Sequence, residues 1–297
     1  MRSLNVELEF LTPAFVGSAD PAIPELRGAS IRGHLRWWWR VSEGHRFSED
    51  YAKMLESESA LFGGVGHGAR RSPVVLWLQP VNELKSYDMD SFCRYLGYGL
   101  RERRNPRQAL APGTAFRLVA EWREGSLGKE QEEQFCRALA RWIRYGGLGA
   151  RSRKGFGALH LRSLDGEAKA LFESLWKAPS PPNRDLPATL PPFPQWQGAS
   201  HFPTVKGEGS GLAVLKKMKE SYKGVRTQLR RHAWVLGETG GGKSRRASSV
   251  LIYVTREGET FQGGFLALPC RREPESDEKR DREAWEALLE NLKKFSS

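Results

Sequence analysis

The beginning of the chain alternates regularly between apolar and polar residues. From Leu4 to Phe10 every second side chain is apolar, and the residues between them are polar. A period of two places all the apolar side chains on one face of an extended segment. The pattern therefore predicts a half-buried strand over residues 4–10.

The apolar period then changes from two to between three and four. Ile31, Leu35 and Trp38 fall on one stripe of a helix that we expect over residues 31–43. Ser30 comes directly before this stripe and is the expected N-cap.

The same reading continues to about residue 165. We expect strands near residues 73–79, 114–123 and 156–164, a helix over 129–145, and a helical insertion over 82–112 that ends in a basic loop. Without the insertion, the order is β-α-β-β-α-β, which is typical of a ferredoxin-like domain.

A second unit is expected after a proline-rich connection. Residues 178–203 contain eight prolines and predict an irregular linker. Beyond it the pattern indicates a helix over 212–234, strands near 249–255 and 261–268, and a helix from about residue 277. We predict domains at residues 1–165 and 166–297.

The charge favours a polyanionic partner. Lysine and arginine outnumber the acidic residues by 47 to 35, and the formal net charge is +12. The positive charge is spread along the whole chain, as in proteins with an extended surface for nucleic acid. No apolar run approaches the ~18 residues of a membrane span. The three cysteines form no metal or disulfide pattern. We expect a cytoplasmic protein without a signal peptide, metal or cofactor.

A glycine-rich loop follows the helix predicted over 129–145. Residues 146–157 contain five glycines together with Arg151, Arg153 and Lys154. Glycine allows backbone to approach a ligand closely, and each one costs chain entropy, so a plain turn rarely needs so many. Fixed cations beside exposed N–H groups suit the phosphates of a nucleic acid.

The helix predicted over 31–43 carries a second basic and aromatic cluster. Arg32, Arg36 and Arg40 are spaced by four residues and share one face. Residues 37–39 are three consecutive tryptophans, which point about 100° apart, so at least one should leave the apolar stripe. We expect arginine contacts to phosphates and a tryptophan that stacks on a base.

Residues 237–244 match the pattern of a nucleotide P-loop. In a P-loop a strand precedes the glycines and a helix follows them, so that the helix N-terminus meets the phosphates. Here residues 228–236 resemble the end of a helix, and residues 248–255 resemble a strand. We interpret the segment as a basic loop whose Lys243, Arg245 and Arg246 contact phosphates. A P-loop NTPase is a minor alternative.

Histidines offer a different alternative, a metal-independent RNA endonuclease. His34 lies in the basic helix, His67 lies in another glycine-rich loop, and His45 follows the helix. A general base needs a partner group at suitable geometry, and the spacing provides none. No cluster has metal-ligand spacing.

Several segments together resemble a known family. Residues 25–40 (ELRGASIRGHLRWWWR) resemble the first-helix motif of the RAMP superfamily of CRISPR proteins. The end of that helix is similar to the first subunit of the Cmr (type III-B) effector complex. Residues 61–66, 146–157 and 245–249 are similar to later motifs of that subunit, in the same order.

This resemblance implies an α+β protein with two ferredoxin-like (RRM-like) domains and glycine-rich loops. It implies a non-catalytic subunit that contacts the 3′ part of the CRISPR RNA and the target single-stranded RNA, beside other Cmr subunits, in antiviral defence. Some RAMP relatives are endonucleases that process CRISPR RNA, so that alternative stays open. The expected RNA-binding residues are Arg27, Arg32, Arg36, Trp37, Trp39, Arg40, Gly147, Gly149, Arg151, Arg153, Lys154, Phe156, Lys243, Arg245 and Arg246.

Overall fold

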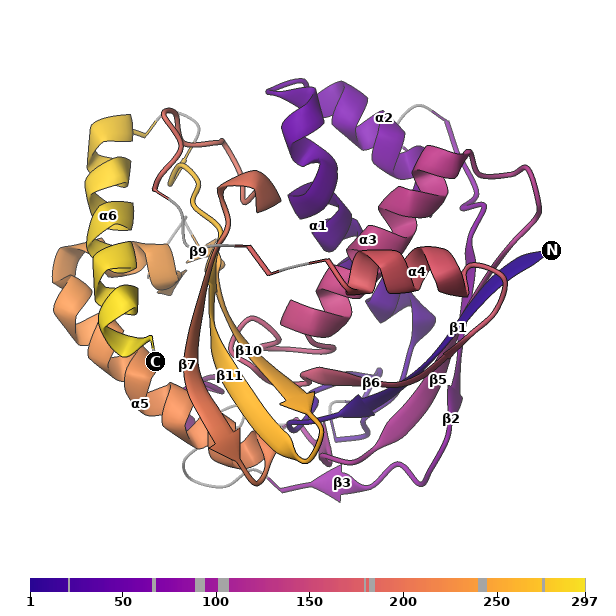
Figure 1. Ribbon diagram of the computed structural model, residues 1–297, viewed down its shortest axis with the longest axis horizontal. Coiled ribbons are helices and arrows are strands. Elements are labelled where there is room, and N and C mark those ends of the chain that lie inside the picture. Colours follow the sequence, from indigo (N-terminus) through magenta and orange to yellow (C-terminus); the bar gives the residue numbers. More distant parts are fainter. Residues whose placement is uncertain are drawn as a thin grey trace.

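Two α+β units lie side by side in the computed structural model of the chain (Figure 1). The structure describes residues 1–20, 22–65, 68–88, 94–100, 107–178, 180–181, 185–239, 245–273 and 276–296. Strands β1, β2, β5 and β6 belong to the first unit, and β7, β10 and β11 belong to the second.

The first unit has the ferredoxin-like arrangement that the sequence predicts. Its four-stranded sheet has the order β2-β5-β1-β6, and every pair is antiparallel. Two helices connect the strands across one face, and two further helices pack beside them. The elements are β1 (Arg2–Phe10), α1 (Gly28–Glu43), α2 (Tyr51–Phe62), β2 (Val75–Pro80), β5 (Ala115–Trp122), α3 (Lys129–Tyr145), β6 (Leu159–Asp165) and α4 (Lys169–Trp176).

The core of this unit lies between the sheet and the helices. The apolar residues of β1 are fully buried, and the predicted stripe of Ile31, Leu35 and Trp38 is at most 1% exposed. The expected cap is wrong, because α1 begins at Gly28 with Arg27 as its N-cap and without a side-chain cap. Ser30 therefore lies inside the helix.

The insertion at 82–112 differs from its prediction. Its described residues contain the short strands β3 (Ser86–Tyr87) and β4 (Ala109–Leu110), with turns at 95–99, and no α-helix. The Leu110 N–H donates to the Ala14 carbonyl over 2.8 Å, so main-chain pairing with a distant loop holds this segment extended. Such tertiary pairing overrides a local helical pattern.

The second unit repeats the order β-α-β-β-α. Its sheet has the order β10-β11-β7, with α5 and α6 on its outer side in Figure 1. The elements are β7 (Ser200–Glu208), α5 (Gly211–Leu229), a 3₁₀ segment (Arg230–Leu236), β8 (Glu238–Thr239), β9 (Arg245–Arg246), β10 (Val250–Glu257), β11 (Thr260–Ala267) and α6 (Glu278–Phe295).

The sequence analysis missed β7, which begins inside the proline-rich stretch. Within the described sheet β7 pairs only with β11, and an edge strand tolerates Pro203 because it needs no donor on its free side. The two long helices of this unit begin at capping residues. The Ser210 hydroxyl accepts from the Ala213 N–H over 3.1 Å, and the Asp277 carboxylate accepts from the Lys279 N–H over 3.0 Å.

The glycine-rich loop joins the two units through the main chain. The Ile252 N–H of β10 donates to the Arg153 carbonyl over 3.0 Å, and Lys154 forms a parallel bridge with Ile252. Aromatic rings also pack across this contact between the two units, which we call the seam. There the ring centroid of Tyr253 lies 5.6 Å from that of Tyr145 of α3. The loop therefore sits between the sheets as a structural connection.

A buried carboxylate ties α2 to α1. Glu58 of α2 has a side chain that is 1% exposed, and it pairs with Arg36 over 2.7 Å and with Arg40. Arg36 also donates to the Phe62 carbonyl over 3.0 Å, at the end of α2. The basic face of α1 thus holds the neighbouring helix.

Removing both arginines should destabilise the fold. Arg36→Ala combined with Arg40→Ala leaves the buried Glu58 carboxylate without these cations, and we expect the free energy of unfolding to fall by about 3–5 kcal/mol. The control is Arg117→Ala, which removes an exposed arginine that lies 3.7 Å from Glu7 and should cost less than about 1 kcal/mol, because Glu7 keeps its pair with Arg162. Equal losses in urea unfolding of the two variants would contradict a structural role for this pair.

Candidate nucleic-acid interface

Helix α1 and the glycine-rich loop meet at one cavity of about 440 Å³. The loop between β1 and α1 forms a further wall, and β10 contributes a single residue. The lining residues are Phe15, Val16, Gly17, Ser30, Gly33, His34, Trp37, Trp38, Arg107, Gly146, Gly147, Gly149, Ala150, Ser152, Arg153 and Leu251. The two segments that the sequence analysis singled out are thereby brought together.

The glycines of the loop are required by the protein's own backbone. A Cβ added at Gly147 would lie 2.6 Å from the Phe156 carbonyl oxygen, and one at Gly149 would lie 2.5 Å from the Phe15 carbonyl oxygen. Gly149 also has φ +101°, a conformation that side chains rarely adopt. Close packing of the loop already demands these glycines, and their contact with RNA stays a prediction.

Gly33 differs from the loop glycines. It lies within α1, lines the cavity and is exposed, and an added Cβ would meet no atom within 4 Å. Glycine in a helix interior costs about 0.5–1 kcal/mol relative to alanine. No contact within the described protein explains this cost.

Arg153 forms the basic wall of the cavity and is held in place. Its guanidinium donates to the Ser248 carbonyl over 2.8 Å and lies 4.5 Å from the ring centroid of Trp37. Burial lowers its pKa to about 10. Trp37 is half-buried and meets Trp38 edge to face, with ring centroids 5.0 Å apart. A cation and an indole ring thus stand together at the cavity wall.

His34 links the helix to the loop. Its Nε2 accepts from the Gly149 N–H over 3.4 Å, and its ring stacks on Trp142 at 6.2 Å between centroids. Burial, with a further contribution from Arg153, lowers the His34 pKa to about 4. The imidazole is therefore neutral at pH 7, with Nε2 engaged as an acceptor.

The other cations of α1 are placed differently from expectation. Arg32 lies 3.4 Å from the carbonyl oxygens of Phe62 and Val74. Arg36 and Arg40 pair with Glu58, as described above. Arg27 is exposed, 4.0 Å from Glu25. Among these arginines, Arg27 keeps the most open position for a phosphate, whereas Arg36 and Arg40 have a structural partner.

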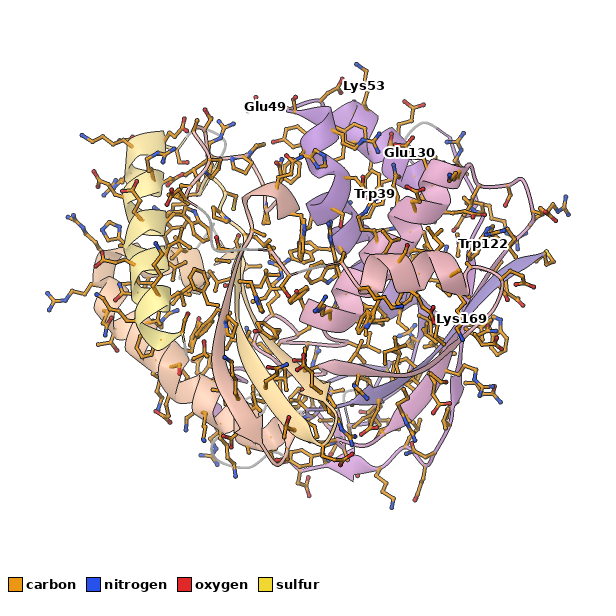
Figure 2. The ribbon with its side chains drawn as sticks, in the orientation of Figure 1. Trp39, Glu49, Lys53, Trp122, Glu130 and Lys169 are labelled. Carbon is orange, nitrogen blue, oxygen red and sulfur yellow. The ribbon has the colours of Figure 1, made fainter. Side chains whose placement is uncertain are left out.

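Two aromatic candidates are corrected by their burial. Trp39 is fully buried and donates from Nε1 to Gln134 over 3.0 Å; Figure 2 shows it between α1 and α3. Phe156 is also fully buried, with its ring edge-on to Phe15 at 5.3 Å. Stacking needs an accessible ring face, so neither can stack on a base in this structure.

Neither Lys154 nor Arg151 lines this cavity. Lys154 is buried at the seam, and Arg151 donates to the Tyr98 carbonyl oxygen. Arg245 and Arg246 form β9, which pairs with β8, and Lys243 lies outside the described residues, as does His67. A 3₁₀ segment precedes the P-loop-like string and strand β10 follows it, as the sequence predicts.

Most of the residues that line the cavity were not among the expected RNA-binding residues, and Ser30, Arg107 and Gly33 are examples. Ser30 was assigned to a cap, Arg107 to an insertion, and Gly33 received no role. Only the helical spacing of Ser30, Gly33 and Trp37 could have indicated a common face.

The described residues contain no group of His, Cys, Asp and Glu side chains that is suited to a metal ion. Among them, also, no helix has the length and apolar character needed to span a bilayer.

Two curated proteins with similar sequences are both CRISPR system Cmr subunits. The CRISPR system Cmr subunit Cmr1-2 of Pyrococcus furiosus is 27% identical over 180 residues, 53% of this chain and 94% of that protein. Subunit Cmr1-1 of the same organism is 29% identical over 147 residues, which cover 46% of this chain and only 41% of that protein.

Solved structures share the fold. The apo crystal structure of Cmr1 from Pyrococcus furiosus has a TM-score of 0.65 at 21% identity, covering 98% of this chain and 97% of that chain. A subunit in the cryo-EM structure of the type III-B Cmr-beta bound to cognate target RNA has a TM-score of 0.57 at 12% identity, covering 98% and 99%.

A sequence profile of the RAMP superfamily matches residues 7–160, just over half of the 297 residues. The matched segment contains α1, most of the ferredoxin-like sheet and the glycine-rich loop. The chain belongs to the RAMP superfamily.

Proposed function

We propose that this protein is a non-catalytic RNA-binding subunit of a CRISPR RNA-guided type III-B (Cmr) effector complex. In that role it contacts the 3′ part of the CRISPR RNA and the target RNA beside other Cmr subunits. The complex acts in the cytoplasm in antiviral defence. The names of the relatives and the net charge of +12 support this assignment. The observation that carries the RNA contact is the cavity shared by α1 and the glycine-rich loop.

The walls of the cavity suit a single RNA strand. Arg153 and Arg107 supply positive charge for phosphates, and Trp37 supplies an aromatic wall for a base. Gly33 leaves open space on the helix where a strand can pass. Sequence recognition then comes from pairing between guide and target, because these contacts address backbone and ring faces and discriminate little between bases.

The outer face of the first sheet is the competing surface, since RRM-like domains bind RNA there. In this protein that face carries Glu7 and Glu9 of β1, and Arg117 of β5 lies opposite Glu7 at 3.7 Å. Arg162 lies 3.4 Å from Glu7 and 3.7 Å from Glu9, so its charge is already compensated. Carboxylates repel phosphates, and the α1 cavity is therefore the favoured surface.

Filling the open helix position should separate binding from folding. Gly33→Ala adds a methyl group toward the cavity, and we expect RNA affinity to fall by roughly tenfold, or about 1.4 kcal/mol. The same change should leave stability unchanged or raise it by about 0.5–1 kcal/mol, because alanine favours the helix. Fluorescence anisotropy with a labelled single-stranded RNA, together with thermal unfolding, measures both quantities.

Gly209→Ala is the matched control, because an added Cβ there also meets no atom within 4 Å and the residue lies away from the cavity. It should bind RNA as the wild type does. A Gly33→Ala protein of normal stability and normal RNA affinity would show that RNA does not use this cavity.

The endonuclease alternative predicts cleavage that depends on a histidine. His34 is a weak base with a pKa of about 4, and its Nε2 is already an acceptor for Gly149. His45 follows α1, and burial is the main cause of its lowered pKa. We expect a CRISPR repeat RNA to remain intact when the protein is incubated with it in EDTA. Cleavage that His34→Ala or His45→Ala abolishes would establish the endonuclease instead.

A further inference from the structure

A small cavity of about 80 Å³ lies where α3, α4 and the turn at Trp196 meet. The two helices pack against each other on the helical side of the first sheet (Figure 1). The cavity shares no lining residue with the α1 cavity or with a larger one of about 580 Å³ that the glycine-rich loop also lines. Small-molecule sites run from about 300 to 1,000 Å³, so this cavity has room for one functional group of a larger ligand.

Three arginines of α3 line the cavity, and two of them already have partners. Arg137 donates to the Glu43 carboxylate over 2.6 Å, and Arg144 donates to the Ala178 carbonyl over 2.9 Å. No carboxylate belongs to the described lining itself. The third arginine, Arg141, differs from its neighbours: its Nη1 is buried and has no hydrogen-bond partner among the described residues.

The surroundings of Arg141 are apolar on one side and basic on the other. Its guanidinium lies 4.0 Å from the ring centroid of Trp196. Burial, with a further contribution from Arg137, lowers the pKa of Arg141 to about 9, and Glu43 opposes this shift, so the group is charged at pH 7. A buried charged donor without an acceptor is unfavourable, and an acceptor from outside the chain would remove that cost.

Two tryptophans frame this arginine. Trp176 of α4 and Trp196 both line the cavity, and both are half-buried. Arginine and tryptophan are enriched among the residues that contribute most to protein–protein binding, where surrounding apolar groups exclude water from a central contact. Exclusion of water also strengthens an ion pair that forms there. The composition of the site is therefore typical of the centre of a protein interface.

The neighbouring charges favour a carboxylate over the phosphates of a nucleic acid. A strand of RNA presents a row of phosphates and needs a series of available cations. Here Glu43 lies 2.6 Å and Glu133 lies 3.9 Å from Arg137, and these carboxylates would repel a phosphate backbone. A single carboxylate is small and planar, and it matches the fork of a guanidinium through two parallel hydrogen bonds.

We propose that this cavity receives an aspartate or glutamate side chain of a protein that docks over α3 and α4. The carboxylate accepts hydrogen bonds from Arg141, and Trp176 and Trp196 shield the pair from water. The surface is separate from the α1 cavity, and the inference does not depend on RNA binding there.

Titration of the isotope-labelled full chain with a blocked glycine–aspartate–glycine peptide, followed by NMR, tests the site. The indole signals of Trp176 and Trp196, assigned with Trp176→Phe and Trp196→Phe, should shift with millimolar affinity. The peptide that carries asparagine in place of aspartate should not shift them. Arg141→Gln should weaken binding about tenfold or more, because the charge-assisted bonds are lost. Arg123→Gln is the control, since it removes an exposed arginine outside the cavity, and binding should not change.

Stability gives a second readout that does not depend on a ligand. Arg141→Met keeps an unbranched side chain and removes the buried donor, so the free chain should unfold at the wild-type temperature or above it. A lower unfolding temperature would show that Arg141 stabilises the free chain, and it would contradict the argument from the missing acceptor.

The proposal is overturned if the two peptides act alike, or if Arg141→Gln binds the aspartate peptide as the wild type does. Inorganic phosphate or a labelled single-stranded RNA that shifts the same indole signals at lower concentration than the peptide would assign the cavity to a phosphate instead. We expect normal RNA affinity in Arg141→Gln. Failure of the peptide to bind, with RNA affinity retained, would remove this docking site and leave the proposed function intact.

Discussion

The structure depends on how the glycine-rich loop is inserted between the two units. The Arg153 carbonyl pairs with Ile252 of β10, and the Arg153 and Lys154 side chains are buried at the same seam. Burying cations is costly unless hydrogen bonds replace the lost water. Here the carbonyls of Ser248 and Leu236 and the ring of Trp37 provide the replacement. The two units are thereby joined, and two cavities share the loop residues Ser152 and Arg153 as lining.

This arrangement separates structural cations from those that are available to a ligand. Arg36 and Arg40 satisfy the buried Glu58, and the outer face of the first sheet is compensated by ion pairs such as Arg162 with Glu7. The net charge of +12 alone does not locate an RNA site. We propose the walls of the α1 cavity as that site, because there the cations stand beside an aromatic ring and open helix surface.

Local patterns predicted much of the fold and less of the candidate site. Alternation gave β1, and the helical stripe of Ile31, Leu35 and Trp38 faces the core as predicted. The ferredoxin-like order follows from these periods and from the connections between elements. The role of Arg36 was not accessible, because its partner Glu58 belongs to a different helix. Gly33 was missed for a related reason, since only the assembled cavity distinguishes an open glycine from a packed one.

We propose that RNA lies in the cavity between α1 and the glycine-rich loop. Ultraviolet cross-linking of a single-stranded RNA to the full chain, with the modified peptides located by mass spectrometry, tests it directly. Trp37 lines the cavity, whereas Trp77 is 44% exposed on β2, on the outer face of the sheet. We predict cross-links at Trp37 and in residues 146–153. Cross-links confined to Trp77 and the outer strands would place the RNA on the sheet and contradict this account.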